Sequence, residues 1–263
     1  MPNNKATLQE IQKYWDRSPC NVNHSKLPAG TLEFFTEVTQ RRYFVEPHIL
    51  KFLDLNAFKG KKVLEIGAGI GTDAAMFAEN GAEYHGIELS PESLSLARKR
   101  FELFHLQGSF TATSVEDLNL KSMGIFSPDL VYSFGVIHHT IDPRSALENV
   151  VKQVEKGCRF KLMVYAKNSW KMAMIEAGLD QHEAQSEVPI AFSYTIEEAV
   201  RLVKESGLKV EKICQDHVFM YNVEKYRAYN YELEPWFANM PMEIKEALKS
   251  KLGWHLLIDA VKV

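Results

Sequence analysis

The chain has 263 residues, 46% of them apolar, and a formal net charge of −3 at neutral pH. This composition fits one sizeable globular domain and excludes a disordered chain. The longest basic run is Arg98-Lys99-Arg100, which argues against a nucleic-acid substrate because phosphate neutralisation needs a concentrated basic surface. No apolar run has the length of a signal peptide or membrane span, and the three cysteines lie far apart, so we expect a cytoplasmic protein without membrane association.

The first 60 residues show no alternation of strands and helices. They are rich in aromatic side chains and include the proline-containing loop Ser18-Pro19-Cys20-Asn21. Long covers of this kind on a compact domain usually serve binding. We therefore predict an N-terminal helical lid or cap over residues 1–60.

From Lys62 onward the pattern changes to alternating strands and helices. The predicted strands are Lys62–Ile66, Glu83–Glu88, Ser109–Thr113, Leu130–Phe134, Arg159–Tyr165, Leu208–Cys214 and His255–Val263. The predicted helices are Asp73–Glu79, Pro91–Phe104, Pro143–Val154 and Glu197–Glu205. This alternation predicts an α/β fold in which parallel strands are joined by right-handed crossovers.

Two later stretches, residues 168–193 and 218–253, interrupt the alternation and are also rich in aromatics. In α/β proteins, loops at the carboxyl ends of parallel strands build binding sites. We therefore predict one compact domain whose core, residues 61–263, carries both stretches as cap insertions over a small-molecule pocket. The alternative is that these segments only stabilise the core.

A glycine-rich turn follows the first predicted strand. Gly67, Gly69 and Gly71 stand at alternate positions directly before a helix. Strand, glycine turn and helix make the first half of a nucleoside-binding unit, since glycine lets a ligand approach the main chain. The dinucleotide fingerprint is GxGxxG, and Thr72 stands where its last glycine would fall. Glu88, at the tip of the second strand, can accept hydrogen bonds from both ribose hydroxyls and would repel a 2′-phosphate.

Four segments together resemble the class I S-adenosylmethionine-dependent methyltransferases of the small-molecule type. They are VLEIGAGIG at residues 63–71, the acidic Glu88, SVEDL at residues 114–118 and PDLVYSFGVIHHTIDP at residues 128–143. The resemblance covers residues 62–165 and the last two predicted strands. It implies a Rossmann-like, seven-stranded, mostly parallel sheet with an antiparallel last strand and helices on both faces. It also implies S-adenosyl-L-methionine as methyl donor and S-adenosyl-L-homocysteine as product.

The resemblance assigns positions around the donor. Glu65, Gly67, Ala68 and Gly69 would face its methionine and ribose portions, with Glu88 on the ribose hydroxyls and Leu89 against the adenine. Ser114, Val115 and Glu116 would border the adenine edge, and Phe134 and Gly135 would flank the methionine arm. Many relatives have Asp at the position of Ser114, so the adenine amino contact would pass to Glu116.

Two histidines follow the fourth predicted strand, where the methyl group should lie. Histidine titrates near neutrality, so His138 and, after it, His139 are the candidates for a general base. The alternative is that one packs and the other caps the following loop. Methyl transfer itself is a displacement at carbon, which mainly requires alignment of the acceptor with the S–CH₃ bond.

The acceptor would meet aromatic and basic side chains from the lid and insertions. The predicted substrate-binding residues are Tyr14, Trp15, His24, Arg42, Tyr43, Tyr165 and Trp170. For each, packing on the core or exposure to solvent is the alternative. Cys20 is expected to pack or to line the pocket, because methyl transfer needs no thiol nucleophile.

His24, His48, His182, His217 and His255 show no spacing typical of metal ligands, so no metal site is predicted. We expect a methyltransferase that acts on a small-molecule acceptor, with O- or N-methylation favoured over C- or S-methylation. The alternatives are an NAD-dependent oxidoreductase, a methyltransferase for protein or RNA, and a non-catalytic binding protein. The sequence does not reveal the oligomeric state.

Overall fold

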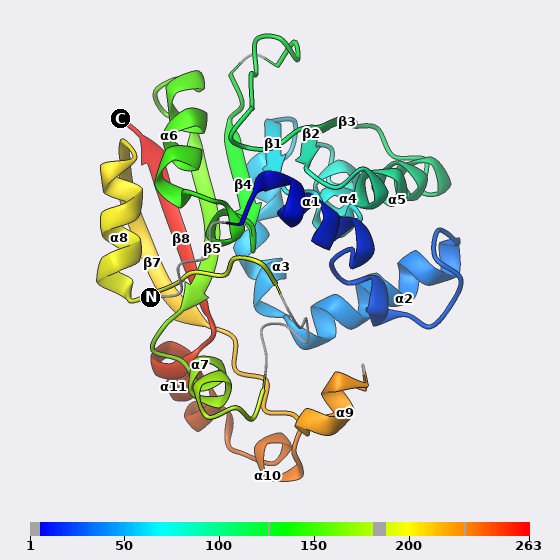
Figure 1. Cartoon of the computed structure of the whole chain (residues 1–263), viewed down its shortest axis with the longest axis vertical. Coiled ribbons are helices and arrows are strands. Elements are labelled where there is room, and N and C mark those ends of the chain that lie inside the picture. Colours follow the sequence, from blue (N-terminus) through cyan, green and yellow to red (C-terminus); the bar gives the residue numbers. More distant parts are fainter. Residues whose placement is uncertain (1–5, 126, 181–187, 229) are drawn as a thin grey trace.

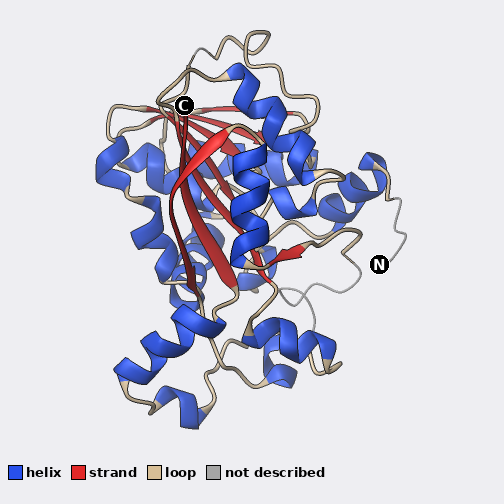
Figure 2. Ribbon diagram, turned by 90° about the vertical axis from the view of Figure 1, so that its left-hand side faces the viewer, coloured by secondary structure: helices blue, strands red, loops and turns tan. Residues whose placement is uncertain are grey.

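A computed structural model describes residues 6–125, 127–180, 188–228 and 230–263. Its centre is a twisted sheet with helices on both sides (Figures 1 and 2). The strands are β1 (Lys62–Ile66), β2 (Glu83–Glu88), β3 (Ser109–Ala112), β4 (Leu130–Phe134), β5 (Arg159–Ala166), β6 (Ser193–Tyr194), β7 (Leu208–Asp216) and β8 (His255–Lys262). Their order is β3-β2-β1-β4-β5-β8-β7, and the short β6 pairs with β5 off this path.

The sheet has the predicted topology. Parallel pairing joins β3, β2, β1, β4 and β5, whereas β8 runs antiparallel to both β5 and β7. The prediction of a seven-stranded, mostly parallel sheet with an antiparallel last strand is confirmed, with β6 as a two-residue addition. The strand order reverses at β1, between β2 and β4, which is where α/β sheets open a crevice at their carboxyl ends.

Helices cover the sheet because the strands are apolar on both faces. The covering helices are α4 (Thr72–Glu79), α5 (Pro91–Leu103), α6 (Pro143–Gln153) and α8 (Ile196–Glu205). Val63 and Leu130 pack in one buried cluster with side chains of α4 and α5, whereas Leu64 and Val131 pack in another with side chains of α6 and α8. This alternation follows from the two-residue period of strands.

The helices begin at residues suited to cap them. Ser90 accepts a hydrogen bond from the N–H of Ser93 at 3.1 Å, and Pro91 occupies the first turn of α5, as predicted. Asp142 caps α6 in the same way, and Thr195 forms a capping box at α8. The predicted helices and strands therefore differ from the observed ones by only one or two residues at their ends.

The N-terminal segment forms helices, as predicted for a lid. They are α1 (Leu8–Arg17), α2 (Leu32–Val45) and α3 (His48–Leu53), with short 3₁₀ turns at Val22–His24 and Leu55–Phe58. Phe34, Phe35 and Val38 of α2 pack with Ile70 of the glycine turn in a cluster of their own. The segment is therefore anchored directly beside the turn that the sequence marks as a ligand site.

Four short helices form a second layer beyond the carboxyl ends of the strands, at the bottom of Figure 1. They are α7 (Trp170–Glu176), α9 (Val223–Arg227), α10 (Pro235–Ala238) and α11 (Met242–Leu252). Trp170, Tyr221 and Tyr226 share a separate buried cluster with Val45 at the end of α2, so the insertions pack against the lid. Residues 181–187 of the first insertion, including His182, lie outside the described part. Among the described helices, none is long and apolar enough to cross a membrane.

Candidate active site

The glycine turn bends the chain from β1 into α4. The N–H groups of Gly67 and Ala68 donate to the carbonyl oxygen of Ile87, at 2.8 and 3.0 Å, and tie the turn to β2. Gly67 has a φ of +77°, and a Cβ there would lie 2.2 Å from Cγ2 of Val136. Gly69, with a φ of +52°, instead faces open space, which leaves its main chain accessible to a ligand.

A first cavity opens at this turn, along the carboxyl ends of β1, β2 and β4. Its empty volume is about 1030 Å³ including its mouth, which is sufficient for a nucleoside-sized ligand. All the predicted donor-binding residues line it: Glu65, Gly67, Ala68, Gly69, Glu88, Leu89, Ser114, Val115, Glu116, Phe134 and Gly135. Sequence reasoning missed other lining residues from the lid, among them Leu8 and Ile11 of α1 and Asn21.

The Glu88 carboxylate is held by main-chain donors on both oxygens. Gly69 N–H donates to Oε2 at 2.8 Å, and Ser90 N–H donates to Oε1 at 2.9 Å. Burial raises the pKa of this carboxyl, while the N–H groups of Ser90, Gly69 and Leu89 oppose that rise. Each carboxylate oxygen can accept a further bond, so the turn fixes an acceptor pair at the cavity wall.

The segment after β3 is also fixed in place. The Ser114 hydroxyl donates to Oδ2 of Asp117 at 2.9 Å and accepts the Asp117 N–H at 3.0 Å. The side-chain amide of Asn149 donates to the carbonyl oxygens of Val115 and Glu116, at 2.9 and 3.2 Å. Because Ser114 is engaged by Asp117, the arrangement agrees with an adenine contact that passes to Glu116, which lines the cavity.

Glu65 and Asp73 lie buried between β1 and α4, both on the first cavity. Tyr84 donates its hydroxyl to Oε2 of Glu65 at 2.6 Å. Burial, and then the charge of Asp73, raise the pKa of Glu65 well above its usual range, whereas the Tyr84 hydrogen bond and Arg42 act against that rise. The pKa of Asp73 is instead lowered, so the two neighbouring carboxyl groups are shifted in opposite directions.

Arg42 is the cation that compensates Asp73. Its Nε and Nη2 donate to the two oxygens of Asp73, each at 3.0 Å, and its Nη1 lies 3.2 Å from Oε2 of Glu46. Tyr132 adds a hydroxyl donor to Asp73 at 2.8 Å. Burial acts to raise the pKa of Asp73, but the charge of Arg42 and the hydrogen bonds lower it below its usual value. Arg42 lines the cavities, yet its guanidinium is mainly occupied in joining the lid to the core.

A second cavity adjoins the first on the side of the lid and insertions. Five of the residues predicted to bind the acceptor line it: Tyr14, Trp15, His24, Arg42 and Tyr165. The two cavities share seven lining residues: Trp15, Cys20, Asn21, Arg42, Phe134, Gly135 and His139. The glycine tip after β4 and the thiol of Cys20 therefore lie where two bound molecules would meet.

Two predicted substrate residues do not reach either cavity. Tyr43 donates its hydroxyl to Oδ1 of Asp73 at 3.0 Å and belongs to the ion-pair network. Trp170 is buried in the cluster of the insertions, and its indole N–H donates to the carbonyl oxygen of His217 at 3.1 Å. Neither residue is among the lining residues of the two described cavities, and both make the contacts expected of the alternative, packing on the core.

The structure reverses the preference between the two histidines after β4. His138 is fully buried, its ring centroid 3.9 Å from that of Tyr165, and it lines neither described cavity. His139 lines both, and its Nδ1 lies 2.5 Å from the carbonyl oxygen of Ile190. A carbonyl only accepts, so Nδ1 carries the proton and Nε2 is the basic nitrogen of the neutral ring. As the structure stands, the His138 imidazole reaches neither described cavity, which favours His139 as the candidate base.

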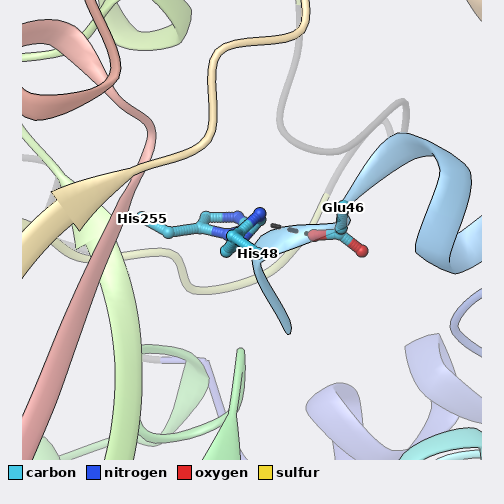
Figure 3. Close-up of side chains that lie close together, drawn as sticks. All are labelled: Glu46, His48 and His255. Carbon is cyan, nitrogen blue, oxygen red and sulfur yellow. Dashed lines mark hydrogen bonds and ion pairs between the residues drawn. The ribbon is translucent and has the colours of Figure 1, made fainter. Parts of the chain in front are cut away.

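The structure also brings together residues that no spacing in the sequence connects. Glu46, His48 and His255 offer ligand atoms that all lie within 4.8 Å of one another (Figure 3). Burial, with smaller effects from His217 and His255, lowers the pKa of His48 well below its usual range. The expectation of no metal site rested on spacing alone, and this spatial group could not be seen from it.

Comparisons with known proteins agree with the fold. A protein-family model described as a methyltransferase domain matches residues 64–160, which span β1 to the start of β5. The chain is similar to the ubiquinone biosynthesis O-methyltransferase of Chromobacterium violaceum, with 32% identity over 114 residues, 43% of this chain and 48% of that protein. The chain thus spans about half the length of the curated relatives it matches.

Solved structures cover the chain more completely. The magnesium protoporphyrin IX methyltransferase of Synechocystis PCC 6803 with bound SAH aligns with a TM-score of 0.63 at 12% identity, over 98% of this chain and 100% of that one. The geranyl diphosphate C-methyltransferase of Streptomyces coelicolor A3(2) aligns with a TM-score of 0.62 at 14% identity, over the full length of both. At such identities the likeness establishes the fold.

Proposed function

We propose that this chain, whose residues 64–160 match a methyltransferase domain, transfers a methyl group from S-adenosylmethionine to a small-molecule acceptor and releases S-adenosylhomocysteine. The observation that carries the proposal is the meeting of two cavities at Phe134, Gly135 and His139. One cavity has the wall of a nucleoside site, and the other has aromatic and imidazole walls suited to a different molecule. A donor and an acceptor held in them would be in contact.

The residues of the first cavity suit the donor. Glu88 offers a fixed pair of oxygens for the two ribose hydroxyls, and Leu89 offers an apolar surface for the adenine. Glu116 would accept from the adenine amino group. Gly69 presents an open main chain beside Glu65, where the methionine portion would lie.

S-Adenosylmethionine, when bound, supplies a methyl group already activated by its sulfonium and transferred by in-line displacement. The protein then has to align the acceptor and remove a proton where the acceptor is a hydroxyl or amine. His139 is the group for this step, because Nε2 is its basic nitrogen and the ring borders both cavities. As the acceptor atom bonds to carbon, its proton would pass to Nε2 of His139.

The second cavity favours a small acceptor with planar and polar parts. Tyr14, Trp15 and Tyr165 supply aromatic walls, while His24 and Glu46 supply polar groups. The C. violaceum relative is an O-methyltransferase, which supports an oxygen acceptor. Amines fit the same walls. We therefore favour O- or N-methylation.

The experiment that tests donor binding is calorimetric titration with S-adenosylhomocysteine and, separately, with NAD. The wild type should bind S-adenosylhomocysteine and not NAD. Glu88→Ala should weaken binding about 10- to 100-fold for each lost bond, since a hydrogen bond to a charged group contributes roughly 1.5–3 kcal/mol. Glu92→Ala, an exposed carboxylate in the first turn of α5, is the matched control and should leave the affinity unchanged. Equal affinity in Glu88→Ala and wild type would refute the assignment.

A second assay separates catalysis from binding alone. Release of S-adenosylhomocysteine is measured with a panel of phenols, alcohols and amines, at saturating donor. Turnover with at least one hydroxyl or amine acceptor is expected. Donor binding without turnover on any acceptor would instead identify a binding protein that keeps the fold.

A further inference from the structure

Three potential metal ligands meet at the wall of the second cavity. Glu46 follows the last residue of α2, His48 is the first residue of α3, and His255 is the first residue of β8. Figure 3 shows the two imidazoles and the carboxylate directed toward one another from these elements. The tight connection between α2 and α3 places Glu46 and His48 together, and the sheet brings His255 to them from the far end of the sequence.

The spacing of these side chains is close to that of ligands bound to one metal ion. Nε2 of His48 lies 2.9 Å from Nδ1 of His255, a hydrogen-bond distance, and the other ring nitrogen of His255, Nε2, lies 3.7 Å from Oε1 of Glu46. Atoms bound to one transition-metal ion at about 2.0–2.2 Å are roughly 3–4.4 Å apart, depending on the bond angle. One ligand atom from each residue falls within 4.8 Å of the other two, so small side-chain rotations would bring all three to a metal ion.

Neighbouring groups hold these side chains in position. Arg42 donates to Oε2 of Glu46 at 3.2 Å and is itself held by Asp73. This contact leaves the other oxygen of Glu46, Oε1, directed toward the imidazoles. The ring of His217 stacks on that of His255, with centroids 4.6 Å apart. Such outer-shell support is what orients ligands in metal sites. The anions Glu46 and Asp73 face the cation Arg42 here, so a divalent ion would add to a region with both signs of charge.

We propose that Glu46, His48 and His255 form a binding site for a divalent transition-metal ion of the zinc type. Two imidazole nitrogens and one carboxylate oxygen are the ligand set that such ions accept, whereas magnesium and calcium prefer oxygen alone. Three protein ligands leave at least one coordination position unfilled by the protein, as in catalytic zinc sites.

Glu46 and His255 both line the second cavity, so a metal ion held by them would border that cavity. A metal ion there would bind a hydroxyl, thiol or carboxylate of the acceptor and would make a bound hydroxyl or thiol easier to deprotonate. This consequence rests on the proposed function, whereas the metal site itself does not. It narrows the acceptor to molecules that carry a metal-binding oxygen or sulfur.

The test is titration of the chelator-treated full chain with Co²⁺, followed by visible absorption, and with Zn²⁺, followed by metal analysis after gel filtration. One equivalent of either metal should bind, and bound Co²⁺ should show the visible d–d absorption bands of an ion coordinated by the protein. His48→Gln and His255→Gln should weaken binding by at least about 100-fold, the upper end of what even an outer-shell residue costs. Glu46→Gln, a conservative change at the chain turn, should weaken it about tenfold or more. The exposed His105 provides the matched control: His105→Asn should bind as the wild type does.

Binding by the wild type that is weakened in all three ligand variants supports the site. Absence of stoichiometric binding, or equal binding by His48→Gln and wild type, overturns it. Circular dichroism verifies that each variant is folded, and at equal metal concentration the metal should raise the melting temperature of the wild type more than that of Glu46→Gln. Affinity for S-adenosylhomocysteine is measured on the same samples. Loss of donor binding with intact metal binding would refute the proposed function and leave the metal site standing.

Discussion

The two cavities are built in different ways. The first is lined mainly by strand tips and their turns, at Gly67–Gly69, Glu88–Leu89 and Ser114–Glu116, with a smaller contribution from the lid. The second is assembled from segments far apart in the chain, with α1, the end of α2, β5, β8 and the region around Tyr226 each contributing one or a few side chains. The first therefore depends on backbone conformation, and the second depends on how the lid and insertions dock.

The two sites should therefore respond differently to changes in the lid. A donor site made by turns should survive changes in the lid, since its N–H donors come from the core. An acceptor site made by docking should fail when the lid is detached. Variants of the lid and of the residues between the cavities test this contrast.

Arg42→Met should have the largest effect, because it removes the cation that joins the lid to Asp73. Breaking a buried ion pair on one side costs about 3–5 kcal/mol, since it leaves an uncompensated charge. Denaturant unfolding should show this loss of stability. In binding titrations, Arg42→Met should lose more affinity for the acceptor than for the donor. Arg144→Met is the control: Arg144 pairs with Glu148 and Glu205 at 3.0 and 2.9 Å at the surface, where the loss is about 0–1 kcal/mol. Equal losses in the two variants would contradict the role of Arg42.

His139→Gln tests the point where the cavities meet. A general base contributes about 10²–10⁴-fold, so turnover on a hydroxyl acceptor should fall at least about 100-fold, with donor affinity unchanged. The same change at the buried His138 should reduce turnover by less than about tenfold and act mainly through stability. Larger loss at His138 would restore it as the base and reject the cavity-based assignment.

The sequence predicted the fold and the first cavity well because both depend on local patterns. Strand periodicity, the three glycines and the cap at Ser90 each require only neighbouring residues to be interpreted. All eleven predicted donor residues line one cavity for this reason.

The second cavity was predicted only in part because it depends on distant contacts. Tyr43 and Trp170 are aromatic residues in the right segments, yet each side chain turns toward a buried polar partner, Asp73 or the His217 carbonyl. Sequence spacing also cannot show that His255 meets His48, since their proximity arises from docking of the lid on β8. Glu46 and His48, separated by one residue, are two possible ligands that the sequence places together. The third, His255, is brought to them only by the folded sheet.

Acid pH should weaken the attachment of the lid. The folded pKa of Asp73 is depressed: burial opposes this shift, but the charge of Arg42 outweighs it. A carboxyl with a folded pKa below its unfolded value stabilises the fold above the unfolded value, and this stabilisation is lost as pH falls through the folded pKa. Asp73 has an ordinary pKa of 3.8, so the stability gap between wild type and Asp73→Asn should narrow below about pH 4. A constant gap from pH 6 to pH 2.5 would contradict this account.

Cysteine labelling offers the mildest test, because it changes no residue. Cys20 lines both cavities, whereas Cys158 is buried and burial raises its pKa to about 12. The thiolate is the reactive form, so iodoacetamide at pH 8 should label Cys20 far faster than Cys158 in the folded protein. Saturating S-adenosylhomocysteine, at about ten times its Kd, should slow labelling of Cys20 roughly tenfold by mass action, as followed by peptide mass spectrometry. If the ligand leaves that rate unaltered, Cys20 borders only the acceptor side, and the two cavities are more separate than their shared walls indicate.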